Sequence, residues 1–431
     1  MWRDRDFRRL WVGQTVSQLG EHTTLVVLPL CAVLTLGAEA GELGVLRAVG
    51  QAPILLLSLP AGAWVDRWRT RTVMVLADSG RALVLGATAV AGLLGALGLP
   101  ALLVAAFAVG ALSVFFDVAY QTSLARLVNR DQLVPGNSAL EGSRSAAQIV
   151  GPALGGALVS VLAAPVAAAS GALLFAMSFL SIRRIRRSEP IPEPTQERSQ
   201  RLAEPTQEHR RCPPRVWLRI GEGLRFVVGD TSLRAVCLAS AAFQFSLAAM
   251  MTVYLLFLPR ELHLSGTEIG LALAATGPGA LLGSLLAARL PGRFGHGVVL
   301  VSAAALGDGA FLFVPALHGS STGAVLALVA VGLVFGTFGQ LVNVTVMGVR
   351  QALTPDGMQG RAAATITFVG MGLTPFGSLL GGFLADEWGL RLSLAVTAAG
   401  MLLSPLLMAL SPLARLGRTL PARGAPCPVR P

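Results

Sequence analysis

The feature that most constrains the fold is a series of apolar runs, each about as long as a membrane-spanning helix, that recurs along the whole chain. A helix needs about 20 mostly apolar residues to cross the hydrocarbon core of a bilayer. Twelve such runs occur, and most connections between them are only a few residues long. The runs cover residues 10–36, 43–64, 72–96, 101–124, 138–161, 165–182, 233–258, 266–288, 298–317, 323–347, 363–384 and 390–410. The sequence therefore predicts an all-α integral membrane protein with twelve transmembrane helices.

The composition agrees with this prediction. Of the 431 residues, 53% are hydrophobic and only 13% are charged, whereas soluble domains carry about 25% charged residues. The sequence contains no lysine, and a phosphate-binding loop of the Walker type needs one, so we expect no ATPase of that kind in the chain. The four cysteines and five histidines are scattered, which predicts neither a disulfide framework nor a metal site, and no cofactor.

Residues 183–232 divide the twelve runs into six and six. This segment is charged, contains several prolines and repeats EPTQE, which is typical of a low-complexity tether. Its last part, VWLRIGEGLRFVVGD, has apolar residues at helical spacing and predicts a short helix on the membrane surface. We therefore expect a six-helix bundle in residues 1–182, the linker in 183–232, a second bundle in 233–412 and a tail in 413–431.

The arginines gather on alternate connections, and short loops rich in arginine lie on the cytoplasmic side of a membrane. They precede the first run, fill the linker, follow the twelfth run and lie between runs two and three, four and five, eight and nine, and ten and eleven. Both termini and the linker are thus expected in the cytoplasm. The net charge of +11 is then an orientation signal and not a nucleic-acid-binding face.

The loop after the second run reads GAWVDRWRTR. With the six-plus-six layout it resembles the major facilitator superfamily, whose signature in this loop is Gly-x-x-x-Asp-Arg-x-Gly-Arg-Arg/Lys. Gly62, Asp66, Arg67 and Arg71 match it, while Arg69 and Thr70 depart from it. The loop can act as a latch, because glycine permits close helix approach and an aspartate is favoured at a helix N-terminus. The alternative is an ordinary positively charged loop.

The resemblance extends over nearly the whole chain. The second half repeats the loop only in degenerate form, since Ala287 stands where the aspartate would be. The stretches RLVNRDQLVPGNSALEGSR and EGLRFVVGDTSLRAV resemble the branch that contains macrolide efflux pumps and the enterobactin exporter. This resemblance implies a monomeric exporter in the bacterial cytoplasmic membrane.

A second motif lies in the fifth run. Gly151, Pro152, Gly155 and Gly156 resemble the end of the antiporter signature. Small residues allow helices to pack closely and proline allows a bend, so this helix could seal the inward cavity and limit proton leak. Plain helix packing is the alternative.

Polar residues inside the runs are the candidate site residues, because ionisable groups in a membrane are costly. The resemblance implies that helices one, four, seven and ten line a central cavity. The residues concerned are Gln14, Gln18 and Glu21 of the first run, Asp117 of the fourth, Gln244 of the seventh, and Gln340 and Asn343 of the tenth.

We expect Glu21 to carry the coupling proton or to meet a cationic substrate. The alternative is a structural acid that pairs with His22 or Arg47, and Asp117 could likewise pair with Arg144. Asp78 and Arg81, three residues apart, are expected to form a local, structural ion pair. Asp308 lies near the middle of the ninth run, a helix expected at the periphery.

The sequence thus favours a proton-coupled antiporter that exports an amphipathic drug, antibiotic, siderophore or other secondary metabolite by alternating access. A lysophospholipid flippase of the same fold and a membrane sensor or assembly protein that transports nothing are the alternatives. A membrane enzyme is disfavoured, because no nucleophile–base pair or metal cluster occurs in the sequence.

Overall fold

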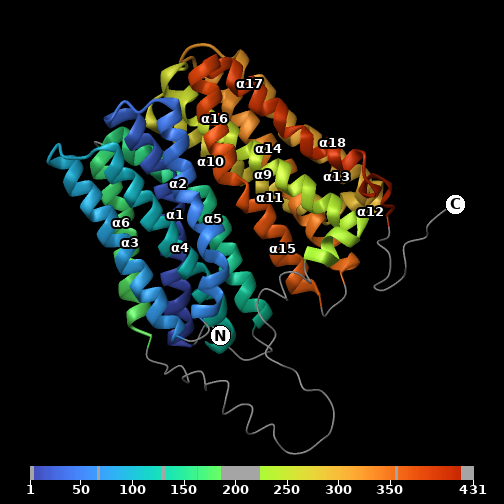
Figure 1. The fold of residues 1–431 in the computed structure, drawn as a ribbon, viewed down its shortest axis with the longest axis horizontal. Helices are drawn as coiled ribbons and strands as arrows, with labels where there is room; N and C mark the ends of the chain where they lie inside the picture. Colours follow the sequence, from blue (N-terminus) through green and yellow to red (C-terminus); the bar gives the residue numbers. More distant parts are fainter. Residues whose placement is uncertain are drawn as a thin grey trace, which may run out of the picture.

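The computed structural model describes residues 4–65, 68–127, 133–162, 164–185, 224–354 and 358–418. Within these ranges the regular structure is helical and contains no strand. The long helices run roughly side by side (Figure 1). The prediction of an all-α membrane protein is confirmed.

Six long helices make up the first half of the chain. They are α1 (Arg5–Thr35), α2 (Ala40–Val65), α3 (Thr70–Leu93), α4 (Leu99–Leu127), α5 (Leu133–Val161) and α6 (Ala164–Arg183). Each contains one predicted apolar run, apart from one to three residues at the ends of α1 and α3. α1 begins earlier than its run because the Asp4 side chain accepts hydrogen bonds from the backbone N–H groups of Asp6 and Phe7, which caps the helix.

The second half contains more and shorter helices. They are α9 (Thr231–Arg260), α10 (Gly266–Ala274), α11 (Thr276–Ala287), α12 (Leu290–Phe294), α13 (His296–Gly309), η2 (Ala310–Ala316), α14 (Thr322–Leu353), α15 (Gln359–Gly372), α16 (Thr374–Trp388), α17 (Leu390–Met401), α18 (Leu403–Ala409) and η3 (Pro412–Arg415). Four of the predicted runs are each divided between two consecutive helices, namely α10 and α11, α13 and η2, α15 and α16, and α17 and α18.

Proline explains these divisions. Pro278, Pro375 and Pro405 each lie two or three residues beyond a break, and proline cannot donate the backbone hydrogen bond that would join the two segments. Pro315 lies inside η2, where the chain tightens into a 3-10 helix. The apolar runs therefore predict where the chain crosses, and a proline accompanies each division of these four crossings.

Eleven helical segments among the described residues are long and apolar enough to cross a membrane. The predicted run 138–161 lies within α5, but α5 is not among the eleven. Its first half is LVPGNSALEGSRSAAQ, which includes Glu141 and Arg144 and many small polar residues. The twelfth crossing therefore stays a prediction.

Each half packs mainly within itself. In the first half α1 contacts α5 and α6, α2 contacts α4, and α3 contacts α4 and α6; in the second half α11 contacts α14, and α9 contacts α16 and α17. The halves meet chiefly where α2 contacts α16 and α5 contacts α10. Figure 1 shows this meeting at the top, at the end away from the N-terminus.

The buried apolar clusters follow the same division. One cluster joins both halves at the end where they meet and includes Leu30, Leu43, Leu258 and Val314. At the other end each half has a cluster of its own, around Phe7 and Phe116 in the first half and around Leu233 and Leu300 in the second. Among the described residues, the shared apolar cluster therefore closes the halves against each other at one end of the molecule.

Two sequence predictions fall largely outside the described residues. Residues 186–223 of the linker and 419–431 of the tail are not described, and of the expected surface helix only 224–229 is described, as a helical turn. The four-part division of the chain stays a prediction.

Candidate functional site

The polar face of α1 is directed into the first half. Gln14, Ser17, Gln18 and Thr24 are buried, and the Glu21 side chain is 23% exposed. Among the described residues neither amide atom of Gln14 has a hydrogen-bond partner. Gln18 donates from Nε2 to Asp117 Oδ1 of α4 over 3.4 Å. These side chains recur at helical spacing along one face of α1, so the face that carries the predicted residues Gln14, Gln18 and Glu21 is an internal surface.

Arg81 of α3 is the centre of the polar interior of the first half, and its side chain is fully buried. It pairs with Asp78 on its own helix and donates to Ser17 Oγ of α1 over 2.9 Å and to Ser113 Oγ of α4 over 3.1 Å. The rings of Phe116 and Phe175 lie 4.5 Å and 4.3 Å from the guanidinium carbon. One arginine thus ties together α1, α3, α4 and α6 through hydrogen bonds and cation–π contacts.

Glu21 is held more loosely. Its Oε2 lies 3.6 Å from Arg81 Nη1, and among the described residues this buried oxygen has no hydrogen-bond partner. Asp78, in contrast, accepts hydrogen bonds from Ser17 over 3.1 Å and from Ser178 over 2.5 Å. Among the described residues, Glu21 forms its ion pair with Arg81, whereas the structural alternative named His22 or Arg47.

Arg144 of α5 interacts electrostatically with both Glu21 and Asp117. Asp117 thus interacts with Arg144, as the sequence suggested, and also accepts a hydrogen bond from Gln18, which the sequence did not suggest. We call Glu21, Asp78, Arg81, Asp117 and Arg144 the charge cluster. Its three carboxyl groups outnumber its two guanidinium groups, so one bound proton makes the cluster neutral.

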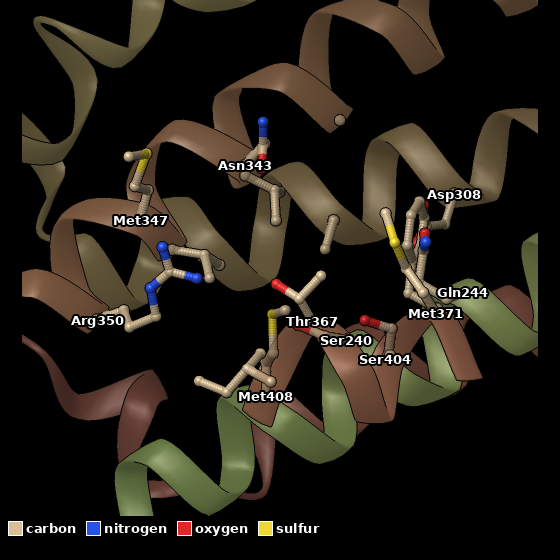
Figure 2. A pocket seen from close by; sticks show the side chains of 17 residues that line it. Ser240, Gln244, Asp308, Asn343, Met347, Arg350, Thr367, Met371, Ser404 and Met408 are labelled. Carbon is tan, nitrogen blue, oxygen red and sulfur yellow. The ribbon is translucent and has the colours of Figure 1, made fainter. Parts of the chain in front are cut away.

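A cavity of about 320 Å³ lies within the second half, and we call it cavity A. It contains Gln244 of α9 and Asn343 of α14, two of the predicted site residues, together with Asp308 of α13 (Figure 2). Its other walls include Phe243, Met347, Met371 and Met408. An apolar cavity with a few polar groups is typical of small-molecule sites.

A second cavity, cavity B, has a volume of about 440 Å³ and lies between the halves. Its walls come from α5 (Ser145, Gln148 and Ile149) and from α9, α11 and α14, and Gln340 is one of them. Phe243 and Gly339 line both cavities, so A and B adjoin. None of the described residues that line them comes from α1 or α4.

The predicted site residues are therefore gathered in three places and not in one pocket. Glu21, Gln18 and Asp117 belong to the interior of the first half, Gln244 and Asn343 to cavity A, and Gln340 to cavity B. Sequence spacing identified the inward faces of the helices, but the tilt of each half decides which faces share a space.

The glycines of the antiporter-like motif lie at two helix crossings. A Cβ atom on Gly155 would lie 3.0 Å from the Thr23 carbonyl oxygen of α1, and one on Gly156 would lie 2.6 Å from the Gly270 nitrogen of α10. Gly151 likewise packs against His22 and Thr23. This face of α5 therefore touches α1 directly after Glu21 and also touches the other half of the molecule.

The predicted latch can be followed only in part. Gly62 lies in the last turn of α2, whereas Asp66 and Arg67 fall outside the described residues. Arg71, at the start of α3, donates to the Arg183 carbonyl at the end of α6 over 2.5 Å. The observed contact of this loop is thus with the end of a neighbouring helix.

Sequence reasoning gave too little weight to two candidate residues, Arg81 and Asp308. The spacing of Asp78 and Arg81 predicted their ion pair correctly, but only the packing reveals that Arg81 also meets Glu21. Asp308 was visible as a lone acid in an apolar run, and the expectation that its helix is peripheral hid its place on cavity A.

Comparison with known proteins decides the family. Residues 2–422 match the model of a family described as transmembrane secretion effectors. The chain belongs to this family.

Curated relatives include proteins named multidrug efflux pump Tap. The one from Mycobacterium tuberculosis is 27% identical over 418 residues, with 90% of each chain covered. The one from Mycolicibacterium fortuitum is 29% identical over 397 residues, covering 89% of this chain and 90% of the relative. This chain is accordingly an efflux-type transporter of the bacterial cytoplasmic membrane and not an enzyme.

Solved structures agree on the major facilitator fold. A bacterial homologue of the iron transporter ferroportin in an inward-facing state has a TM-score of 0.71 at 17% identity, and covers 94% of this chain and 98% of its own. The nucleoside transporter NupG has a TM-score of 0.68 at 12% identity, with the same coverage of both chains. At these identities the likeness establishes the fold alone.

Proposed function

We propose that this transporter exports an amphipathic compound in exchange for protons, by alternating access of a site between its two halves. The names of the curated relatives support export of drug-like compounds. The mixed walls of cavities A and B, apolar with a few amides and hydroxyls, suit an amphipathic substrate. The observation that carries the coupling is the loose hold on Glu21, whose Oε2 lies 3.6 Å from Arg81 Nη1 and has no hydrogen-bond partner among the described residues.

The proposed topology has twelve crossings in two six-helix halves, with both termini in the cytoplasm. The loops rich in arginine lie at the end where the halves have separate cores, and the loops poor in arginine lie at the end where they meet. By the positive-inside rule the molecule is then closed toward the outside, and the cavity between the halves faces the cytoplasm.

Protonation of Glu21 would act through the charge cluster. A neutral Glu21 loses its attraction to Arg81, which keeps Asp78 as its counter-ion, and the cluster becomes neutral. Because α1 directly after Glu21 packs against Gly151 and Gly155 of α5, a change at Glu21 reaches the helix that also contacts α10. Protonation of Glu21 would therefore shift the equilibrium between the closed and the open arrangement of the crossing of α5 with α10.

The first test is a panel of antibiotics and metabolites in a pump-deficient bacterial host that expresses the wild type, Glu21→Gln or Glu387→Gln. Glu387 is an exposed acid, so its amide variant is a matched control. We expect resistance to one compound class with the wild type and the control, and none with Glu21→Gln at equal membrane abundance.

The coupling is tested in everted vesicles with an imposed pH gradient and a compound from that class. Glu21→Gln should slow gradient-driven uptake at least tenfold, whereas Glu387→Gln should match the wild type. Wild-type rates in Glu21→Gln would move the coupling proton to another group. No resistance to any compound, with confirmed expression, would argue against drug export altogether.

A further inference from the structure

Asp308 is a buried acid that has no partner among the described residues. It lies near the middle of the segment His296–Ala316 that is long and apolar enough to cross a membrane, its exposed fraction is 3%, and it lines cavity A. Among the residues that the structure describes, none donates a hydrogen bond to its carboxyl group or forms an ion pair with it. A buried carboxylate is costly without such a partner.

The acids of the first half make the contrast clear. Asp78 and Glu21 each meet the Arg81 guanidinium, and Asp117 has Gln18 and Arg144. Each of these acids therefore has a cationic group of the chain itself nearby. Within the described part of the chain, Asp308 has no such group, so it becomes neutral either by binding a proton or by accepting a cationic group from outside the chain.

The residues that line cavity A indicate which kind of cation can bind beside Asp308. Phe243, Met347, Met371 and Met408 surround the space, and Gln244 and Asn343 add two amides. Methionine adapts to ligands of varied shape, and an aromatic face attracts a cation. An inorganic cation such as Ca²⁺ would need about six or more oxygen ligands, whereas one acid in an apolar space suits a single ammonium group on an apolar body.

We propose that cavity A is a binding site for amphipathic organic amines, with the ammonium group held by Asp308. A volume of about 320 Å³ is at the lower end of the range for small-molecule sites, so it admits one amine with a small apolar or aromatic body. The assignment of such amines as export substrates rests on the proposed function; the binding itself does not.

Arg350 suggests the route of entry. It lines cavity A from the last turn of α14, and Figure 2 shows it at the opposite side of the view from Asp308. A guanidinium there repels cations that approach past it. Because Phe243 and Gly339 line both cavities, an amine enters from cavity B, between the halves.

The test measures binding to the purified full chain in detergent, with dansylcadaverine as a fluorescent amine and its N-acetyl derivative as a neutral match. The wild type should bind the amine on the order of tenfold more tightly than the acetylated form, as expected for a charged contact. Asp308→Asn should remove this preference and leave binding of the acetylated form unchanged. Glu387→Gln, which removes an exposed acid of the same half, should behave as the wild type.

A second variant checks the location without touching the charge. A Cβ atom on Gly339 would meet nothing within 4 Å, so Gly339→Leu places its side chain into open space at the junction of the cavities. It should weaken binding of both probes at least tenfold without lowering the unfolding temperature.

Three results would overturn the proposal: no binding of the amine by the wild type, equal binding of both probes by the wild type, or an unchanged preference in Asp308→Asn. Vesicle transport separates this proposal from the proposed function. If binding depends on Asp308 but the vesicles transport nothing, the site is supported and export is contradicted. If Asp308→Asn changes neither export nor the probe preference, only the site is contradicted.

Discussion

Arg81 illustrates, at the residue scale, how one side chain can hold a half of a transporter together. It is fully buried and its charge is balanced by Asp78 and Glu21. Arg81→Met keeps much of its volume but leaves Asp78 buried without a cation, which costs about 3–5 kcal/mol. We expect a clearly lower unfolding temperature of the purified protein, and recovery of most of the loss in Asp78→Asn/Arg81→Met. A single variant as stable as the wild type would contradict this role.

At the same scale, contacts between residues that are near in sequence could be predicted, whereas contacts between residues that are far apart in sequence could not. The Asp78–Arg81 pair follows from helical spacing and is confirmed. The contact of Glu21 with Arg81 joins two helices that are far apart in sequence, and no spacing rule reaches across them. The lone Asp308 was recognised as costly, but its surroundings depend on five helices that meet only in the folded chain.

At the scale of the element, α5 is one of the two helices of the first half whose packing chiefly connects the halves. Gly156 lies so close to α10 that a side chain there would have to displace it. Gly156→Val should therefore disfavour the closed arrangement, while Gly142→Val on the same helix, where an added Cβ meets nothing within 4 Å, should not. The hydroxyl oxygens of Ser160 and Thr267 lie 2.5 Å apart. Cysteines introduced at these two positions, in a protein whose native cysteines have been replaced, can form a disulfide when α5 and α10 are in contact.

The expected result is that oxidation joins the two cysteines several-fold more slowly in Gly156→Val than in Gly142→Val. Equal rates in the two variants would mean that this crossing tolerates a side chain.

Helix identity was predictable for these elements because hydropathy acts locally along the chain. The division of four crossings into two helices each was not predicted, although Pro278, Pro375 and Pro405 stand in the sequence, because proline can either bend or end a helix.

At the scale of the whole molecule, the two halves are joined at one end by polar contacts as well as by a common core. Arg260 donates to the Ala38 carbonyl over 2.6 Å, and the Gly41 N–H group donates to Asp386 Oδ2 over 2.8 Å. The two-half division and the side on which each loop lies stay predictions from the sequence, whereas a conformational state is a property of the packed molecule. These contacts identify which end is closed.

Removing both contacts should move the molecule toward opening at that end. Each is a hydrogen bond to a charged group, worth about 1 kcal/mol when partly exposed, so Arg260→Ala/Asp386→Ala should raise the open population on the order of tenfold. A cysteine at Gln340, in cavity B between the halves, reports this opening when a membrane-impermeant thiol reagent is added to intact cells. We expect labelling to accelerate several-fold in the double variant and to stay slow in Glu387→Ala, which removes an exposed acid beside Asp386. Labelling that is slow in every variant would contradict a gate made by these contacts, since it would mean that the apolar core alone keeps the halves closed.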